Sequence, residues 1–561
     1  MNHLIRLVIV VSLAIFSFIK VEAQGDAIFH LDKPYYVAGE AVFYNAYLPA
    51  TFDGVSGKVK VVVASGDKSF REESFVQLSD GQIAGYFKVP FNVSSDVYRF
   101  SFYALANGSF GAVEFTNFDL PIYNDLSGEG LRPIFPDGQL SYTNASSNNK
   151  LNISLDNSFY NVRDEVGVRV GVTDATGKSV PAKISIAVTD ESLLGGSSQN
   201  LTVFSRPITI DNGIKLGFDE RIFVQGKIKN ANAEPVSVSV IGAYNARENK
   251  MHYTKSNKSG DFTLLMPDQK GDHTLQIVGY LYDEYPDTKV EMSTPMSETS
   301  NISFTNVHDA DVQQYITSSN KRKRIYQYFN QLENDFEVEP LTIDRQDVKP
   351  NETYKVKEYV NLENIGRFFG EILGGQLDFI KEGDKITART YNPESNRSRG
   401  RKNFEYLARS PVFIIDGKMT KNAEYVYNMK LDNIETIDLY FDWRDITKQF
   451  GTFGEFGYVV IKTNLADVSL PAEDSEDIIS YSGLQPAITY PIEIKSMERS
   501  IPVFKPSVYW HPALDIKKPG DGNVKFNASD DISTFMVTVV AETADGQILT
   551  GTSSFKTTDS Q

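Results

Sequence analysis

The sequence contains no cysteine. This excludes a disulfide framework, although an exported protein could use one. It also excludes a lipid-acceptor cysteine, so we do not expect a lipoprotein of the usual kind. The chain must therefore be stabilised by burial of apolar surface. Its 41% hydrophobic and 12% aromatic residues are sufficient for well-formed cores.

Histidine is scarce, and none of the six histidines stands in a paired metal-ligand spacing such as His-Glu-x-x-His. A Gly-x-Ser-x-Gly elbow, a phosphate loop and an EF-hand loop are also missing from the sequence. We therefore expect no catalytic residues, no metal site and no cofactor. An enzyme, such as a glycan hydrolase with an unrecognised carboxylate pair, stays an alternative because catalytic groups assemble across a fold.

The sequence has no apolar run of membrane-spanning length. The longest, Leu7 to Ile19, has 13 residues, whereas a spanning helix needs about 20. Arg6 precedes this run and Val21-Glu22-Ala23 follows it, which predicts a cleavable secretory signal at residues 1–23. An uncleaved anchor is the alternative. We expect an exported protein that is peripheral to a membrane rather than spanning it.

Positive charge is also scarce, since 56 Lys and Arg residues face 73 Asp and Glu residues, giving a net charge of −17. Nucleic acid requires a basic footprint, so we expect no nucleic-acid partner. Two basic clusters are either solvated faces and loops or docking sites for an acidic partner or anionic lipid headgroups. These clusters are Lys321-Arg322-Lys323-Arg324 and the candidate partner contact Arg397, Arg399, Arg401 and Lys402.

The segment from Pro411 to Thr463 carries the most specific pattern. Its unbroken apolar run Val412 to Ile415 predicts a strand buried on both faces, and Asp416-Gly417 predicts the turn after it. Further strands are predicted at 434–441 and 458–461. The glycines between them predict a tight, irregular hairpin; they are Gly451, Gly454 and Gly457.

The order Ile415-Asp416-Gly417, Ile434-Glu435-Thr436-Ile437 and Gly457 to Thr463 resembles the plug domain of TonB-dependent outer-membrane receptors. About a hundred residues follow Thr463, too few for a receptor barrel, so we expect a plug without its barrel. The alternative is an ordinary small α/β domain with the same strands. In either case turn-forming and strand-edge roles, rather than catalysis, are expected for the motif residues Asp416, Gly417, Glu435, Gly451 and Gly457.

The rest of the chain predicts β-sandwiches, because short alternating strands recur between turn residues. Asp32-Lys33-Pro34-Tyr35, followed by Gly39-Glu40 and Val42, resembles the opening of a macroglobulin-repeat domain of the alpha-2-macroglobulin superfamily. The run Ala182 to Leu194 resembles another macroglobulin strand, in which Asp190 ends the strand and caps the turn. Gly226-Lys227-Ile228 and its neighbours resemble the carboxypeptidase-regulatory-like sandwich.

The predicted fold class is mainly β, with tandem immunoglobulin-like or macroglobulin β-sandwiches, one α/β plug-like domain and a short helical connector. The predicted modules are a signal peptide (1–23), a macroglobulin-like sandwich (24–125), a second sandwich (126–219), a carboxypeptidase-regulatory-like sandwich (220–306), a helical connector (307–342), the plug-like domain (343–465) and a C-terminal macroglobulin-like strand region (466–561).

These resemblances imply a non-catalytic binding or assembly protein of the outer-membrane region, a subunit or accessory of a transport or assembly complex. Its partners would be other envelope or outer-membrane proteins, and it would lie in the periplasm or at the cell surface. One alternative is a plug-like gate acting in trans on a separate barrel. Another is a macroglobulin-like protease inhibitor without a thioester, since a thioester requires the missing cysteine.

Overall fold

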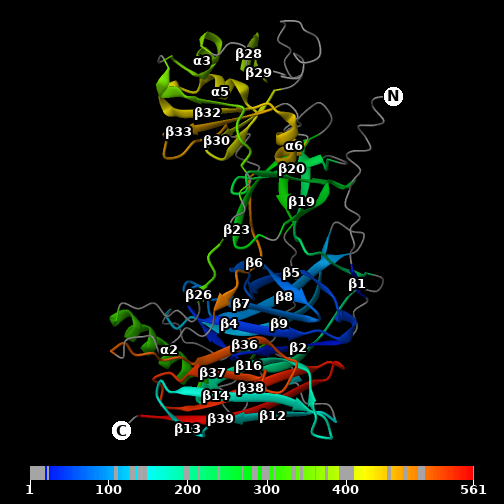
Figure 1. Ribbon diagram of the computed structural model, residues 1–561, viewed down its shortest axis with the longest axis vertical. Coiled ribbons are helices and arrows are strands. Elements are labelled where there is room, and N and C mark those ends of the chain that lie inside the picture. The colour runs from blue at the N-terminus through cyan, green and yellow to red at the C-terminus, as the bar shows by residue number, and fades with distance from the viewer. Residues whose placement is uncertain are drawn as a thin grey trace. The chain divides into compact units, whose positions relative to one another are not determined.

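A computed structural model describes the chain as two compact units, each mainly β (Figure 1). Unit 1 comprises Met1–Ile222, Pro295–Pro340 and Leu484–Gln561, and unit 2 comprises Phe223–Thr294 and Leu341–Gly483. Among the described residues, no helix is long and apolar enough to cross a membrane. The described residues are 19–21, 25–106, 111–126, 134–136, 140–141, 148–193, 202–210, 214–236, 240–267, 269–280, 288–293, 304–306, 310–329, 337–341, 345, 347–359, 362–372, 377–383, 385–390, 410–451, 457–471, 478–489 and 500–559.

In unit 1, the first sandwich is a sheet that folds around one aromatic core. Phe100 and Phe118 stack at 4.6 Å between ring centroids, and Phe29 packs 4.9 Å from Phe118. Its elements are β2 (Asp26–Leu31), β3 (Tyr36–Val37), β4 (Ala41–Tyr47), η1 (Ala50–Phe52), β5 (Ser56–Ser65), β6 (Arg71–Ser79), β7 (Gln82–Lys88), β8 (Asp96–Ala106) and β9 (Ala112–Tyr123), joined by β1 (Ile19–Val21), β11 (Leu140–Ser141), β17 (Val203–Pro207) and β18 (Leu216–Phe218).

The structure groups residues 126–219 differently from the sequence-based boundaries. Strands β17 and β18 of that range pair with β2 and β8 of the first sandwich. The reason is apolar burial, because Phe204, Leu216 and Phe218 lie in the first aromatic core. Of the predicted signal peptide, only β1 lies within the described residues, where it pairs with β18.

The second sandwich of unit 1 combines residues 150–193 with C-terminal strands, which the sequence placed in a separate region (Figure 1). Strand β16 is buried at nearly every position, so it needs a neighbour on each edge, and β36 and β38 supply them. The elements are β12 (Lys150–Leu155), β13 (Phe159–Asn161), β14 (Glu165–Thr173), β15 (Ser179–Val180), β16 (Ala182–Asp190), η2 (Glu191–Leu193), β36 (Ser507–Ile516), β37 (Asn523–Asn527), β38 (Thr534–Thr543) and β39 (Ile548–Thr558).

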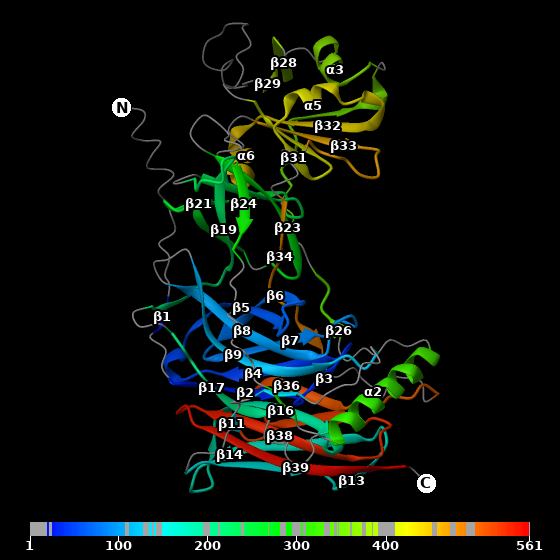
Figure 2. The same ribbon diagram turned by 180° about the vertical axis from the view of Figure 1, so that it is seen from behind.

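One helix of the predicted connector is present in unit 1, where it lies beside β3 (Figure 2). This helix, α2 (Ala310–Tyr328), buries Val312, Tyr315 and Ile316 against Tyr35 and Tyr123. Two short strand pairs complete the unit: β10 (Ile134–Pro136) with β25 (Phe304–Asn306), and β26 (Glu337–Val338) with β35 (Ile488–Thr489).

Unit 2 begins with a sandwich of two small sheets, as the sequence predicts for 220–306. One sheet has the order β22 (Asp261–Met266), β19 (Ile222–Asn230), β24 (Thr288–Met292). The other has the order β21 (Lys250–Lys255), β20 (Val240–Asn245), β23 (Asp272–Tyr280), β34 (Ile478–Ser482). Because β34 follows the plug-like segment in the chain, that segment is an insertion into the sandwich.

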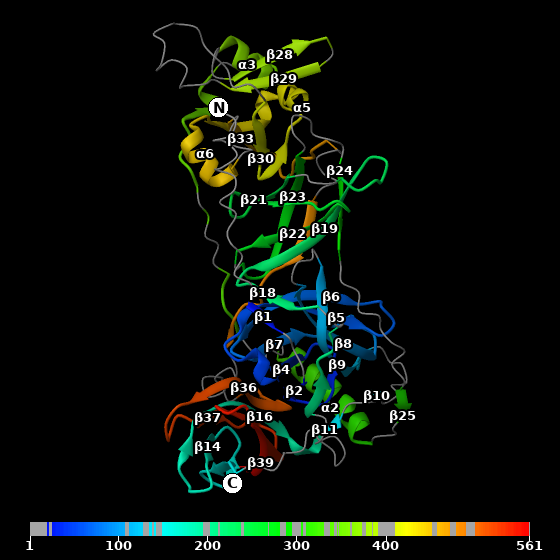
Figure 3. The ribbon, with the colours of Figure 1, turned by 90° about the vertical axis from the view of Figure 1, so that its right-hand side faces the viewer.

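The plug-like segment forms a five-stranded α/β sheet in which β30 and β33 are parallel (Figure 3). The three predicted strands all form. Helix α6 occupies the connection between β32 and β33 up to Phe450, and residues 452–456 of the predicted glycine hairpin lie outside the described residues. The elements are β27 (Glu352–Lys355), η4 (Val356–Glu358), α3 (Ile365–Glu371), the hairpin β28 (Leu377–Glu382) and β29 (Lys385–Thr390), β30 (Val412–Ile415), β31 (Lys418–Thr420), α5 (Ala423–Asn428), η5 (Leu431–Asn433), β32 (Ile434–Tyr440), α6 (Trp443–Phe450) and β33 (Tyr458–Thr463).

The two faces of this α/β sheet have different neighbours. One face carries Phe413 and Ile415 and packs against α3 and α5. The other face carries Val412 and Ile414 and packs against α6 and against Tyr244 of the sandwich. The plug-like segment and the sandwich of unit 2 therefore share a buried apolar core.

Candidate functional site

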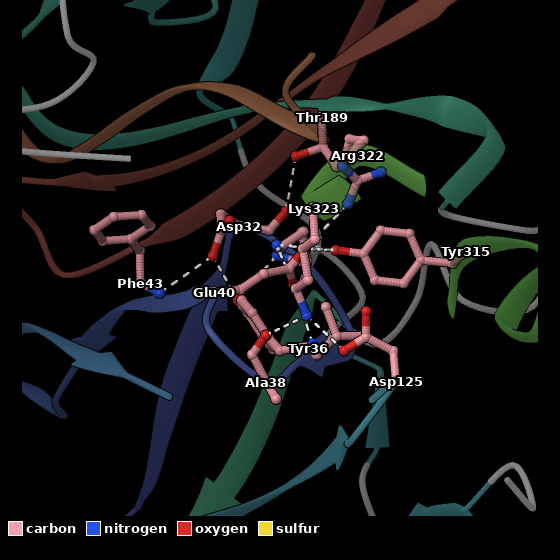
Figure 4. A network of polar contacts seen from close by, with 12 residues as sticks. Asp32, Tyr36, Ala38, Glu40, Phe43, Asp125, Thr189, Tyr315, Arg322 and Lys323 are labelled. Atoms are coloured by element: carbon pink, nitrogen blue, oxygen red, sulfur yellow. Dashed lines mark hydrogen bonds and ion pairs between the residues drawn. The ribbon is translucent and has the colours of Figure 1, made fainter. Parts of the chain in front are cut away.

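A network of buried charges surrounds Glu40 in unit 1 (Figure 4). One carboxylate oxygen of Glu40 accepts from Lys33 Nζ at 2.8 Å and from the backbone N–H of Val37 at 3.2 Å. The other accepts from the Tyr315 hydroxyl and lies 3.3 Å from Arg322 Nη2. We name this set the Glu40 network; it comprises Asp32, Lys33, Tyr36, Glu40, Asp125, Tyr315, Arg322 and Lys323.

The Asp-Lys-Pro-x-Tyr-x-x-Gly-Glu motif builds the sandwich side of the Glu40 network. Asp32 accepts hydrogen bonds from the Tyr36 hydroxyl at 2.5 Å and from the backbone N–H of Phe43 at 3.2 Å. Gly39 has a φ of 90°, and a Cβ at that position would lie 2.3 Å from the Phe91 ring. Only glycine fits there, and the turn it allows brings Glu40 back toward Lys33.

Helix α2 supplies the other side of the network, through the basic cluster at 321–324. Arg322 and Lys323 are buried, whereas Lys321 and Arg324 are exposed. Lys323 Nζ donates to the backbone oxygen of Ala38 and forms an ion pair with Asp125, both at 2.5 Å. The sequence predicted four solvated or docking cations. The structure instead places two of them inside unit 1, because successive helix positions point in different directions.

The same helix is tied to the second sandwich. The Tyr326 hydroxyl donates to the backbone oxygen of Phe504 at 2.7 Å and accepts from its N–H at 3.0 Å. The Thr189 hydroxyl, at the end of β16, donates to the backbone oxygen of Asp32 at 2.8 Å. The Glu40 network therefore lies where the first sandwich, the second sandwich and α2 meet.

Burial and charge pairing act in opposite directions on the acids of this region. Burial raises the pKa of Asp32 to about 6, in spite of the neighbouring Lys33 cation. Burial also raises the pKa of Asp531 to about 6, although Ser529 and the backbone N–H of Lys505 donate to it. For Glu40, burial favours a higher pKa, but Lys33 and Arg322 outweigh it and hold the pKa below its ordinary value.

This arrangement fits a structural clamp better than a reaction centre. Glu40 is 1% exposed and Lys33 is 4% exposed, so no solute reaches the paired charges. Each charge of the central ion pairs has an opposite charge within 3.3 Å. The clamp fixes α2 on unit 1 and sets which of its side chains face outward.

A buried Ser–His pair has a similar structural role. His30 Nδ1 lies 2.6 Å from Ser185 Oγ, and the Tyr47 hydroxyl donates to the same oxygen at 2.7 Å. Burial lowers the pKa of His30 to about 3, and both His30 and Ser185 are 0% exposed. A nucleophile needs access to a substrate, so this pair bridges the two sandwiches rather than forming a catalytic centre.

The predicted motif residues of the plug-like segment lie at turns and bends. Asp416 and Gly417 form the turn after β30, with φ values of 48° and 85°. The Asp416 carboxylate accepts from the backbone N–H of Thr463 at 2.9 Å and from its hydroxyl at 2.5 Å, which joins this turn to β33. Glu435 is exposed, at a register irregularity between β32 and β33.

The two glycines flank the end of α6 and the start of β33. Gly451 directly follows α6, with a φ of 51°. Gly457 has a φ of 80°, and a Cβ there would lie 2.8 Å from the backbone oxygen of Tyr440. The candidate contact residues Arg397, Arg399, Arg401 and Lys402 lie outside the described residues.

Sequence reasoning missed a cleft of about 770 Å³ in unit 2. Its walls are β30, β32 and β33 of the α/β sheet with the turn after β30, the turn between β20 and β21, and residues 345 and 347–350. Its acids already have partners: Asp347 pairs with Arg345 at 2.9 Å, and Asp438 accepts from Thr353 Oγ1 at 2.6 Å. Three segments far apart in the sequence meet here, so no local pattern signals the cleft.

Comparisons with known proteins find only structural neighbours with low TM-scores. No protein-family model matches the chain, and a search of curated proteins gives no match either. Among solved structures, elastase-activated alpha-2-macroglobulin from Escherichia coli matches 95% of this chain and 44% of its own, with 9% identity and a TM-score of 0.23. The native form of the same protein matches 98% and 40%, with 10% identity and a TM-score of 0.23.

A Salmonella alpha-2-macroglobulin mutant gives similar values, with 97% of this chain and 40% of its own matched, 10% identity and a TM-score of 0.23. This chain thus spans less than half of the length of the alpha-2-macroglobulins it matches. A TM-score of 0.23 does not establish a common domain arrangement, so membership of the family does not follow.

Proposed function

We propose that this protein is a non-catalytic binding and assembly protein of the outer-membrane region. It acts as a subunit or accessory of an outer-membrane transport or assembly complex. In this proposal the sandwiches are a support, and the α/β insertion of unit 2 recognises a folded partner. The chain is exported and stays peripheral to the membrane.

The observation that carries the proposal is the way the α/β insertion is mounted. Its sheet uses one face for its own helices and the other for the sandwich of unit 2. The outer strands of this sheet are β27 and β31, and the backbone N–H and oxygen of Met419 in β31 already bond to the Gln276 side chain, so β27 is the edge relevant to this proposal. An outer strand has backbone groups that can pair with a strand of another protein, which is a common mode of recognition.

The proposal assigns no catalytic role to the two buried polar clusters of unit 1, because both are enclosed. The Glu40 network and the His30–Ser185 pair are enclosed and internally bonded. Their chemistry is that of structural bonds between sandwiches. A plug-like gate acting in trans and a protease inhibitor without a thioester are the competing functions.

Purification of the tagged protein from outer membranes after mild detergent extraction tests the proposal. The expected result is a defined outer-membrane protein recovered in stoichiometric amount. If that protein is a barrel whose solute flux falls on binding, the trans-gate alternative replaces the proposal. If the protein instead reduces digestion of a large substrate by elastase and no membrane protein is recovered, the inhibitor alternative replaces it.

A further inference from the structure

The outward face of α2 differs sharply from its buried face. Positions 314, 317, 321, 324 and 328 are all exposed and follow the three- and four-residue spacing of one helix face. On this face, Lys321, Arg324 and Tyr328 are neighbours along the C-terminal half of the helix. Phe329 follows directly, and its ring centroid lies 5.3 Å from that of Tyr328. We name Lys321, Arg324, Tyr328 and Phe329 the α2 stripe.

The two cations of the α2 stripe lie on the same helix face and have no acidic residue three or four positions away on the helix. Residues 317, 318, 320, 325 and 327, which lie three or four positions from them, are Thr, Ser, Asn, Ile and Gln. Lys321 and Arg324 are themselves three positions apart, a spacing at which like charges repel. Among the described residues, neither cation lies within ion-pair distance of a carboxylate. This contrasts with Arg322 and Lys323, which are both neutralised internally.

The aromatic part of the stripe is unusually open. Tyr328 is 85% exposed and Phe329 is 37% exposed. Tyrosine and arginine side chains together are the residues that most often dominate protein–protein binding energies. The clamp around Glu40 fixes the helix that carries the two aromatic and two cationic side chains of the α2 stripe. Little conformational freedom is therefore lost when a partner binds.

We propose that the α2 stripe is a docking surface for an acidic segment of a partner protein. Carboxylates of that segment would pair with Lys321 and Arg324, and an apolar side chain would pack on Tyr328 and Phe329. Charge complementarity favours this occupant, because Lys321 and Arg324 lie outward and have no carboxylate within ion-pair distance in the described part of the chain. The stripe is therefore a local positive site on a chain that is acidic overall, at −17. An anionic membrane fits less well, because Gln314 and Thr317 on the same face are polar and offer no apolar surface for insertion.

This inference rests on the proposed binding function and names the chemistry of the partner. Its test uses the full exported protein and two synthetic probes. One probe is a 15-residue peptide of repeated Glu-Asp-Phe, and the other is its neutral counterpart of repeated Gln-Asn-Phe. Vesicles of phosphatidylglycerol and phosphatidylethanolamine form the membrane arm. The stripe variant is Lys321→Ala, Arg324→Ala, Tyr328→Ala.

A matched control variant removes two exposed lysines and one exposed aromatic elsewhere in unit 1: Lys88→Ala, Lys178→Ala, Phe159→Ala. Unchanged thermal melting of both variants shows that the fold is intact. We expect the acidic peptide to bind the wild-type protein and the control equally, and the stripe variant about tenfold more weakly. The proposal is overturned if the neutral peptide binds the wild-type protein as tightly as the acidic peptide does. It is also overturned if the stripe variant binds the acidic peptide as tightly as the wild-type protein does, or if the wild-type protein binds the vesicles and not the peptide.

The same variants separate this inference from the function on which it rests. A photo-crosslinking residue at position 328 should capture, in intact cells, a partner peptide rich in Asp and Glu. Capture of a peptide without acidic residues would refute the stripe's role. If an outer-membrane partner co-purifies equally with wild-type and stripe-variant protein, the proposed function stands and the inference fails.

Discussion

Removal of the charge of Glu40 provides the sharpest test of the clamp. Glu40→Gln keeps the shape of the side chain but leaves Lys33 and Arg322 buried opposite a neutral amide. These cations have side-chain exposures of 5% and 11%, so water screens them little. Breaking a buried ion pair on one side typically destabilises a protein by about 3–5 kcal/mol. We expect unit 1 to lose stability within this range.

Urea unfolding followed by Trp510 fluorescence measures the loss. Trp510 is 3% exposed and packs on Phe43 in unit 1, and a Trp443→Phe background removes the second tryptophan of the sequence. Glu165→Gln is the matched control, since Glu165 pairs with Lys525 at 2.6 Å and both side chains are at least half exposed. For that exposed pair, we expect a loss much smaller than that of Glu40→Gln, because water screens both charges.

A second variant separates charge from packing. Replacing the whole group, as Glu40→Leu with Lys33→Met and Arg322→Met, removes the two cations together with the carboxylate and should recover most of the lost stability. Hydrogen exchange adds a local readout, because the α2 amides should exchange faster in Glu40→Gln than those of β16. A loss for Glu40→Gln no larger than that for Glu165→Gln would refute the electrostatic argument.

Three further outcomes are expected. Asp32 and Asp531 have pKa values raised to about 6, above the values they would have in the unfolded chain. Unit 1 should therefore become more stable as the pH falls from about 7 to 4. Urea midpoints measured across this pH range should show a smaller gain in stability for Asp531→Asn than for the wild-type protein. Below that range the gain should reverse as Glu40, whose pKa is lowered, becomes protonated. A fragment of residues 343–465 should aggregate, whereas Phe223–Thr294 joined by a flexible linker to Leu341–Gly483 should give a dispersed NMR spectrum, because Val412 and Ile414 share a core with Tyr244 and Met251; a folded short fragment would contradict this. Gly457→Ala should destabilise unit 2 by about 1–3 kcal/mol in thermal melts, because a Cβ at position 457 would meet the Tyr440 carbonyl and the residue has a positive φ. For the exposed Glu435→Ala, we expect a loss of no more than about 0.5 kcal/mol.

Local patterns predicted the strands well, because alternation and turn residues are encoded within a few positions. The strands at 412–415, 434–440 and 458–463 follow directly from their apolar runs and from Asp416-Gly417. Helix α6, which precedes the glycines before β33, was not predicted, since glycine spacing does not show whether a helix or a loop leads into the turn.

Long-range partners could not be predicted in the same way. Nothing in the sequence near Glu40 shows that its counter-charges include Arg322, which lies 282 positions away. Nothing near β16 shows that its neighbours are β36 and β38. In both cases the local sequence pattern indicates that the charge or the strand is buried. Which residues neutralise the charge or cover the strand is determined only by the three-dimensional fold.

The position of β16 has a consequence for synthesis. Its two neighbours begin at Ser507 and Thr534, more than 300 residues after Asp190, so the second sandwich cannot close until both of those strands have left the ribosome. Until then the apolar side chains of Ile184, Ile186 and Val188 stay exposed to solvent. The growing chain would therefore need a chaperone to keep this strand from aggregating. Chains interrupted before Ser507 would keep this apolar strand open. The late closure therefore leaves chains that stop before Ser507 open to proteolysis at this strand.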